Sequence, residues 1–188
     1  MDDNAIMSLV TGGEISAMGI LYEKYKKPLY GYFLKVTLGD CHTSEDLVHT
    51  VFYRAIKYKA SFKGQGSFAK WLFHIAHNVS IDQKKKVTGI IEYTADILHG
   101  IPVRYDDQDD KAQRNENLET LRKALGKLTS EERELVTMCK IECLRYSDVA
   151  DIMGISESNV KVRMFRAIRK LRDIFMKLEK CRYEKTGS

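Results

Sequence analysis

Several residues of this 188-residue sequence are of types that can hold metal ions or act as nucleophiles. His74 and His77 share one face of a predicted helix, Asp82 follows five residues later, and Cys139 and Cys143 lie one helical turn apart. A zinc site at the two cysteines would need two more ligands, and the histidines lack the HExxH pattern of a zinc protease. The four cysteines form no CxxC pair, which favours small buried side chains in a reduced cytosol. We therefore expect no metal, no cofactor and no catalytic residue, so the chain is predicted not to be an enzyme.

A different chemistry, the recognition of DNA, is indicated by residues 146–172. Gly154 permits a tight left-handed turn, Ile155 fills the corner, and Ser156 can cap a following helix. Apolar residues lie on one face of each predicted helix: Val149, Ala150 and Met153 before the turn, and Val160, Met164, Ala167, Ile168 and Leu171 after it. Two helices that meet at such a corner are typical of a helix-turn-helix, whose second helix enters the major groove of DNA.

The opposite face of the second helix is basic and carries one aromatic side chain. Arg166 is suited to a bidentate contact with guanine, and Lys161 to a phosphate or a base edge. The alternative is a helical hairpin of a bundle with a solvated basic face, but small Ala150, corner Gly154 and capping Ser156 favour DNA binding. The residues predicted to contact DNA here are Ser156, Ser158, Lys161, Val162, Phe165, Arg166 and Arg169.

Charge alternates along the chain in four blocks. The net charge is −3 for residues 1–53, +7 for 54–86, −5 for 87–152 and +6 for 153–188, which gives +5 in total. A polyanion could bind the two basic blocks and release counterions. Charge alone does not distinguish such binding from solvated helix faces.

Helical periodicity runs through the first half of the chain, without convincing strand alternation. One helix is expected over residues 14–37. Thr43 or Ser44 is expected to cap the next helix, with Glu45 and Asp46 in its first turn, where the helix dipole favours acidic side chains. The apolar stripe of this second helix comprises Leu47, Val48, Val51, Phe52, Ala55 and Ile56.

A glycine-containing loop, Phe62–Gly66, precedes a third predicted helix, for which Ser67 is the expected cap. The third helix is expected to turn Trp71, Leu72, Ile75, Ala76 and Val79 inward and to end at Lys84, Lys85 and Lys86. Residues 89–112, which follow, have no periodicity and are rich in acidic side chains, so they are interpreted as a flexible linker between two domains.

Further helices are predicted in the second half, which makes the expected fold all-α with two small helical domains. One helix is expected near residues 113–127, and a capping box at Thr129 and Glu132 starts another that runs to about residue 142. The predicted division is residues 1–88, a flexible acidic linker over 89–112, and residues 113–180 with the helix-turn-helix.

Residues 128–171 have the sequence LTSEERELVTMCKIECLRYSDVADIMGISESNVKVRMFRAIRKL. This stretch resembles the fourth conserved region of extracytoplasmic-function (ECF) sigma factors, which binds the promoter −35 element. Residues 21–35, 44–56 and 62–86 are similar to the second region of the family, which binds RNA polymerase and melts the −10 element. The resemblance implies a sigma factor that binds core RNA polymerase and directs promoter-specific initiation of transcription.

The resemblance also implies roles for individual residues of the first half. The helix that contains Glu45, Asp46, Leu47 and Phe52 corresponds to the one that docks on the β′ clamp helices of polymerase. The following loop corresponds to the element that captures a flipped non-template base, and its glycines let the backbone approach the strand closely. The implied −10 and melting contacts are Phe62, Lys63, Gly64, Gln65, Ser67, Asn78, Asp82 and Lys85. Trp71 lies in the apolar stripe, which favours a structural role over base stacking.

Three positions depart from the family pattern. Val162 stands where the family usually has a small hydroxyl residue, which shifts the expected base preference toward a thymine methyl. Thr50 replaces a common acidic residue, and His77 replaces a common arginine. These departures bear on polymerase docking and on backbone contact, and they leave the overall match unchanged.

The resemblance implies three partners: core RNA polymerase, through its β′ clamp helices and β flap, promoter DNA, and an anti-sigma factor. The acidic N-terminus is unlike a secretory signal, and no apolar run approaches the roughly 20 residues of a membrane helix, so a cytoplasmic protein without membrane insertion is expected. A conventional helix-turn-helix regulator would instead bind operator DNA without core polymerase, and a helical adaptor would bind no DNA. An enzyme that uses His74, His77 and Asp82 has no supporting motif.

Overall fold

The computed structural model describes residues 2–88 and 111–186, and every regular element in these two ranges is helical. The predicted linker over residues 89–112 lies outside the described residues, except that its last two residues belong to a helix. The all-α fold class is therefore confirmed.

The N-terminal half is built around large apolar side chains that are withdrawn from water. Leu21, Leu29, Phe33, Val51 and Leu72 are all fully buried, and each such side chain contributes roughly 1.5–3 kcal/mol relative to an exposed one. Packing of these side chains, more than intrinsic helix propensity, therefore holds the helices together. The elements are α1 (Asp3–Thr11), η1 (Ile15–Ala17), α2 (Met18–Val36), α3 (Cys41–Lys57), η2 (Lys59–Ser61) and α4 (Phe68–Thr88).

The start of α3 differs from the prediction. Asp40, and not Thr43 or Ser44, caps the helix, because its Oδ1 accepts the backbone N–H of Thr43 at 3.0 Å. Three residues able to cap lie within five positions, and the carboxylate has the added attraction of its charge to the helix dipole. The helix begins directly after Asp40, so Glu45 and Asp46 lie beyond its first turn and not within it.

The predicted apolar stripes are largely confirmed, with one exception on α3. Leu47, Val48, Val51, Phe52 and Ala55 are buried, as are Leu72, Ala76 and Val79 of α4. Ile56, which was predicted to face inward, is 37% exposed, because it lies at the edge of the stripe near the end of the helix. Trp71 and Ile75 are half-buried and pack against the core. Ser67 caps α4 as predicted, since its Oγ accepts the backbone N–H of Lys70 at 3.2 Å.

The C-terminal half consists of α5 (Lys111–Gly126), α6 (Ser130–Val136), a π-helical turn η3 (Thr137–Ile141), α7 (Tyr146–Met153) and α8 (Glu157–Thr186). The capping box predicted before α6 is present in full. The Thr129 Oγ1 accepts the backbone N–H of Glu132 at 3.2 Å, and the Glu132 carboxylate accepts the backbone N–H of Thr129 at 2.8 Å.

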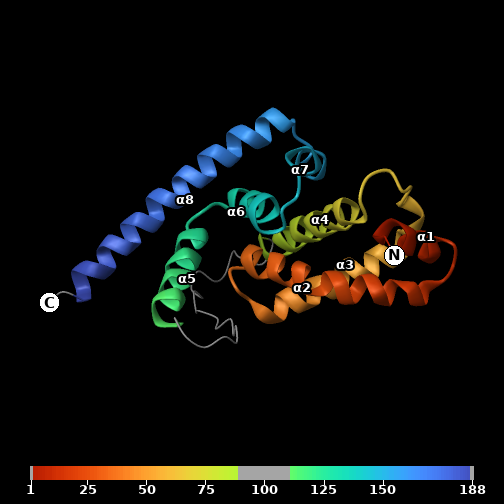
Figure 1. The fold of residues 1–188 in the computed structure, drawn as a ribbon, viewed down its shortest axis with the longest axis horizontal. Helices are drawn as coiled ribbons and strands as arrows, with labels where there is room; N and C mark the ends of the chain where they lie inside the picture. Colours follow the sequence, from red (N-terminus) through yellow and green to blue (C-terminus); the bar gives the residue numbers. More distant parts are fainter. Residues whose placement is uncertain (1, 89–110, 187–188) are drawn as a thin grey trace.

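The two halves pack against each other. α6 contacts α2, and α7 contacts α4. In Figure 1, α6 lies beside α4, while α8 starts next to α7 and extends past α5 to the C-terminus. The buried apolar residues of the two halves form one continuous cluster. The structure therefore shows two helical units that share a buried seam.

Candidate nucleic-acid interface

The helix-turn-helix predicted from the sequence is formed by α7 and the first turns of α8. Gly154 ends α7 with a left-handed φ of 65°, and the Ser156 Oγ accepts the backbone N–H of Asn159 at 3.2 Å. The corner is held by buried Val149, Ala150 and Ile152 from α7 and by Val160, Met164 and Ala167 from α8. Ile168 of α8 was predicted on this inner face but is 38% exposed. Ile152 of α7 is buried at the corner, although the sequence pattern did not assign it to the inner face.

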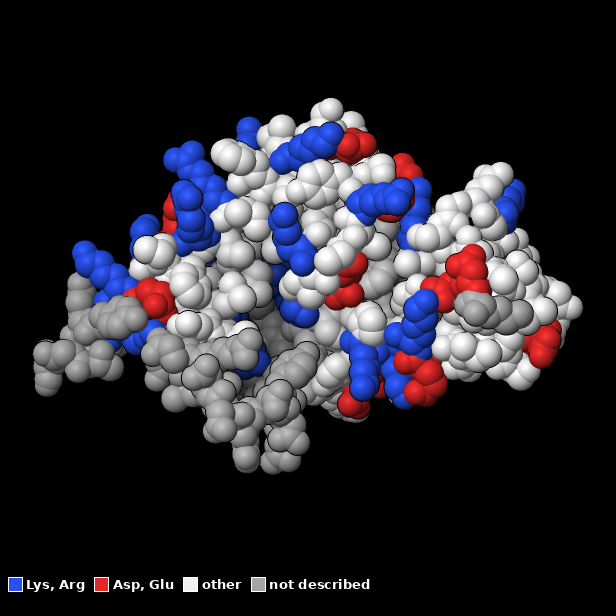
Figure 2. Space-filling view, viewed as in Figure 1, with Lys and Arg blue, Asp and Glu red and all other residues white. Residues whose placement is uncertain are grey.

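Within the described residues, the outer face of α8 is exposed. Phe165 is 70% exposed and Val162 is 49% exposed, which are high values for apolar side chains. Lys161, Arg166 and Arg169 are also exposed, as are Ser156, which caps the helix, and Ser158. Figure 2 shows Lys and Arg side chains gathered along α8, with few acidic side chains among them. An exposed aromatic group within a basic helix face is suited to a DNA groove.

The predicted −10 loop projects from the N-terminal half between η2 and α4. Lys63, Gln65 and Ser67 are exposed, and Gly64 and Gly66 adopt left-handed φ values of 69° and 89°. At both glycines a side chain would strain the backbone. The loop therefore presents polar side chains and accessible backbone to the solvent.

Aromatic residues pack together where the loop joins the N-terminal core. Phe62 is buried, and its ring centroid lies 5.4 Å from that of Trp71 and 6.1 Å from that of Phe68. The indole N–H of Trp71 donates to the Ser61 Oγ at 3.2 Å. These contacts place Phe62 and Trp71 in the scaffold of the loop in this structure.

The remaining residues predicted to contact the −10 element lie on α4. Asn78 and Lys85 are exposed. Asp82 is half-exposed and accepts a hydrogen bond from Arg54 of α3 at 2.8 Å. The Asp82 carboxylate is thus already engaged in linking two helices.

The residues predicted to bind polymerase divide into two groups on α3. Glu45 and Asp46 are exposed, whereas Leu47 and Phe52 are only 6% and 5% exposed and belong to the N-terminal core. Tyr53, which is 66% exposed on the same helix, was not singled out by its sequence position. Its exposure could be found only from the packing of α3.

A buried polar cluster joins the two halves. Glu134 of α6 is 1% exposed, and its carboxylate accepts a hydrogen bond from the Tyr32 hydroxyl of α2. His77 Nδ1 lies 2.7 Å from Glu134 Oε1, and Lys84 Nζ lies 3.0 Å from Oε2. Burial raises the pKa of Glu134, but hydrogen bonds from His77 and Tyr32 and the charge of Lys84 outweigh it, so the pKa lies below its usual value. The His77 departure noted in the sequence thus lies at the seam.

Further contacts along the seam are also polar. The buried guanidinium of Arg133 donates to the backbone oxygens of Leu125, Leu128 and Val36, the last of them across the seam at 3.2 Å. Lys70 of α4 forms ion pairs with Asp148 and Asp151, with a distance of 3.7 Å to Asp148. Lys70, from the basic block of the first half, is therefore paired with acidic side chains of the second half.

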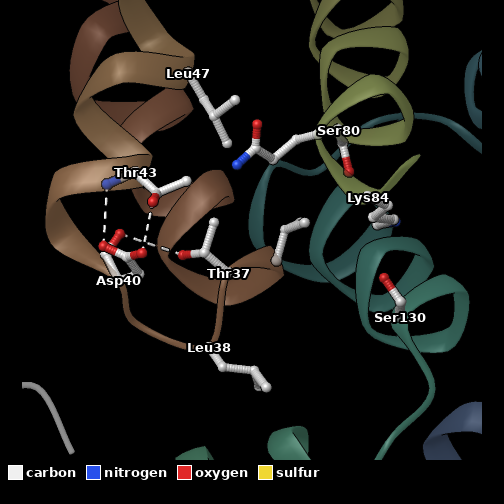
Figure 3. Close-up of a pocket in the computed structure, with 10 residues that line it drawn as sticks. Thr37, Leu38, Asp40, Thr43, Leu47, Ser80, Lys84 and Ser130 are labelled. Carbon is white, nitrogen blue, oxygen red and sulfur yellow. Dashed lines mark hydrogen bonds between the residues drawn. The ribbon is translucent and has the colours of Figure 1, made fainter. Parts of the chain in front are cut away.

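A cleft of about 380 Å³ opens at the seam. Figure 3 shows that its walls come from the end of α2 and the start of α3, from Ser80 and Lys84 of α4, and from Ser130 of α6. Thr37, Leu38, Asp40, Thr43 and Leu47 form the first of these walls. A ligand in this cleft would contact both halves.

Among the described residues, no three His, Cys, Asp or Glu side chains cluster in a way that could hold a metal ion. His77 and Asp82, two of the candidate ligands, are paired with Glu134 and Arg54. Cys139 is buried, and burial raises the pKa of its thiol to about 11. Within the same described ranges, no helix is both long enough and apolar enough to cross a bilayer.

Two family models match the chain in separate segments. The family described as Sigma-70 region 2 matches residues 21–89, which include the predicted −10 loop and α3. The family described as Sigma-70, region 4 matches residues 118–171, which include the helix-turn-helix.

Curated relatives align over most of the chain. The ECF RNA polymerase sigma factor BldN of Streptomyces coelicolor is 31% identical over 175 residues, which cover 90% of this chain and 66% of BldN. The RNA polymerase sigma factor YlaC of Bacillus subtilis is 30% identical over 153 residues, which cover 78% of this chain and 85% of YlaC.

Solved structures share the fold. CnrH, solved in complex with the cytosolic domain of CnrY, aligns with a TM-score of 0.68 at 22% identity, over 92% of this chain and 96% of CnrH. The sigma factor RpoE of Bartonella quintana, solved with the anti-sigma factor NepR, aligns with a TM-score of 0.67 at 21% identity, over 83% of this chain and 96% of RpoE.

Proposed function

We propose a mechanism for this chain, which belongs to the extracytoplasmic-function (ECF) group of RNA polymerase sigma factors. A sigma factor binds core RNA polymerase and directs initiation to promoters. One observation carries the mechanism. Each matched region presents an exposed surface that is suited to binding nucleic acid: the basic face of α8 in one, and the polar, glycine-containing loop before α4 in the other. The two surfaces would act together on polymerase-bound DNA.

The exposed face of α8 would bind the −35 duplex. Arg166 would donate two hydrogen bonds to a guanine, and Lys161 would contact a phosphate or a base edge. Val162 and Phe165 are exposed and apolar, and they would contact a thymine methyl group. Ser156, Ser158 and Arg169 lie exposed around this face, where they would contact the DNA backbone.

The loop before α4 would capture an unpaired base of the −10 element. Lys63, Gln65 and Ser67 supply exposed donors and acceptors, and the glycines allow close approach of the strand. Asn78 and Lys85 extend the polar surface along α4. Binding energy to the captured base offsets the unstacking of a few base pairs, so no catalytic residue is needed and we propose that the chain is not an enzyme.

Polymerase would be bound through α3. Glu45 and Asp46 are exposed and would face the β′ clamp helices, while Leu47 and Phe52 hold α3 to the core and keep its outer face in place. The C-terminal half would contact the β flap. Because core polymerase works in the cytoplasm, the chain would work there too. An anti-sigma factor is proposed as a further partner, and the cleft at the seam would let one partner segment touch both halves.

Transcription from a promoter library with purified core polymerase tests the proposal. Adding the chain should produce transcripts whose start sites share −35 and −10 sequences at fixed spacing. Arg166→Ala should alter the −35 preference, and Lys177→Ala, an exposed substitution farther along α8, should not. If the chain yields no promoter-dependent transcript while another sigma factor activates the same polymerase, the proposal is wrong. Operator binding without polymerase would favour the conventional regulator.

A further inference from the structure

The −10 loop is held by a side chain from α1. Asn4 Nδ2 donates to the backbone oxygen of Gly66 at 2.8 Å, and Asn4 Oδ1 accepts the backbone N–H of Phe68 at 2.8 Å. One amide group therefore fixes the backbone on both sides of Ser67, across more than sixty residues of sequence. The side chain thus donates one hydrogen bond through its amide nitrogen and accepts one through its amide oxygen, both with this segment.

The same helix also holds the chain that leads into the loop. Lys59 Nζ, in η2, donates to the backbone oxygen of Val10 at 3.1 Å. α1 thus contacts the segments before and after the loop. The loop itself is closed between two points that α1 fixes.

α1 is firmly attached to the rest of the N-terminal half. Ile6, Met7 and Val10 are buried in the core. Asp3 accepts hydrogen bonds from Lys24 at 2.7 Å and from the Tyr25 hydroxyl at 2.6 Å. A helix anchored in this way can act as a rigid support for the loop.

The contacts from α1 matter because the two glycines give the loop backbone more conformational freedom than other residues would. The space beside Gly64 and Gly66, where a Cβ atom would project, is open except for the Lys70 side chain, which lies 3.7 Å from that point at Gly66. Glycine loses more conformational freedom on ordering than any other residue, so an unsupported loop would bind a base with an added entropic cost. A fixed Gly66 carbonyl removes part of that cost in advance.

We propose that Asn4 is a positioning residue that pre-organises the Phe62–Ser67 loop for capture of the unpaired −10 base. The proposal rests on the proposed function of this loop. It assigns to α1, outside the segment that matches region 2, a part in base selection.

The test uses holoenzyme assembled from full-length chain and core polymerase, with fork-junction DNA that exposes the non-template −10 strand. Asn4→Ala should weaken binding of the matched fork about tenfold, the size expected for the loss of one or two net hydrogen bonds. The preference for the matched over a mismatched base should also fall. Affinity for a −35 duplex should stay unchanged, because the −35 surface lies on α8 in the other half of the chain.

Asn4→Asp separates positioning from folding. Aspartate keeps the acceptor for the Phe68 N–H but places a carboxylate against the Gly66 oxygen, so base preference should fall while the thermal midpoint stays close to the wild-type value. Ser8→Ala is the matched control, because the Ser8 hydroxyl bonds within α1, to the backbone oxygen of Asn4.

Gln65→Ala in the loop distinguishes failure of the inference about Asn4 from failure of the −10 assignment of the loop. If Gln65→Ala reduces base preference and both Asn4 variants behave as wild type, the inference about Asn4 is overturned and the function of the loop stands. If Gln65→Ala and Lys63→Ala leave fork binding and base preference unchanged, the −10 assignment fails and the inference fails with it.

Discussion

Glu134 and His77 lie against each other across the seam between the two halves, with the Glu134 Oε1 2.7 Å from the His77 Nδ1. Both side chains are buried, at 1% and 8% exposure. The carboxylate also holds Tyr32 and Lys84, so three groups of the N-terminal half converge on one group of the C-terminal half. The Glu134 carboxylate is therefore one of the groups that join the two halves, together with Arg133, Lys70 and the shared apolar cluster.

Glu134→Ala should lower the free energy of unfolding by about 3 kcal/mol, because it leaves the Tyr32 hydroxyl and the His77 ring buried without their partner. Urea unfolding measures the loss. The control is Glu131→Ala on the same helix, an exposed position where the change should stay within about 0.5 kcal/mol. Equal stabilities of the two variants would contradict the role given to Glu134.

Stability in acid should depend on Glu134. Because the folded state holds its pKa below the usual value, the carboxylate stabilises the fold at pH values above the pKa of an unfolded glutamate, about 4.3, and this contribution is lost as the pH falls through the lower pKa of the folded state. Wild type should therefore lose more stability than Glu134→Gln between about pH 5 and pH 2. Parallel curves for the two proteins in that range would show that the carboxylate is not bound as described.

Arg166→Ala should reduce discrimination at one −35 base pair by about 1–3 kcal/mol, the value of a bidentate contact with guanine. The substitution should leave the thermal midpoint unchanged, because Arg166 is exposed. Binding of holoenzyme to a set of −35 duplexes, each changed at one base pair, measures the effect. A uniform loss over all sequences would instead indicate a phosphate contact.

Gly154→Ala should destabilise the C-terminal half by about 1 kcal/mol, because φ is 65° and a side chain there strains the backbone, while no atom of the described residues lies within 4 Å of the added Cβ. Gly126→Ala is the matched control. Its φ is ordinary and its Cβ would lie 3.7 Å from Leu38, an ordinary contact, so stability should be equal or higher. Thermal unfolding of both variants checks the pair, and a stable Gly154→Ala protein would argue against the left-handed corner.

The helix-turn-helix could be predicted because its determinants are local. Gly154, Ser156 and the apolar positions around them lie within one short stretch, and the capping box at Thr129 and Glu132 spans four residues. Burial at single positions of an apolar stripe could not be predicted, as the exposure of Ile56 near the end of α3 and of Ile168 within α8 shows. At these positions contacts with neighbouring helices decide whether a side chain is buried, and the periodicity of the sequence does not reveal those contacts.

The features that the sequence did not predict are contacts between distant residues. Asn4 and Gly66, or His77 and Glu134, are residues without a motif, and only packing of the helices brings them together. The choice of Asp40 over Thr43 as the cap of α3 is a local version of the same difficulty, because several suitable side chains compete and small energies decide.

Selection of bound DNA from a random pool tests the central claim most directly, because that claim requires two surfaces to act together on polymerase-bound DNA. Holoenzyme should recover sequences with two conserved blocks at a fixed separation, and the free chain should recover none with both. Arg166→Ala should change only the upstream block, and Gln65→Ala only the downstream block. A single symmetric block recovered by the free chain, with core polymerase adding nothing, would contradict the account.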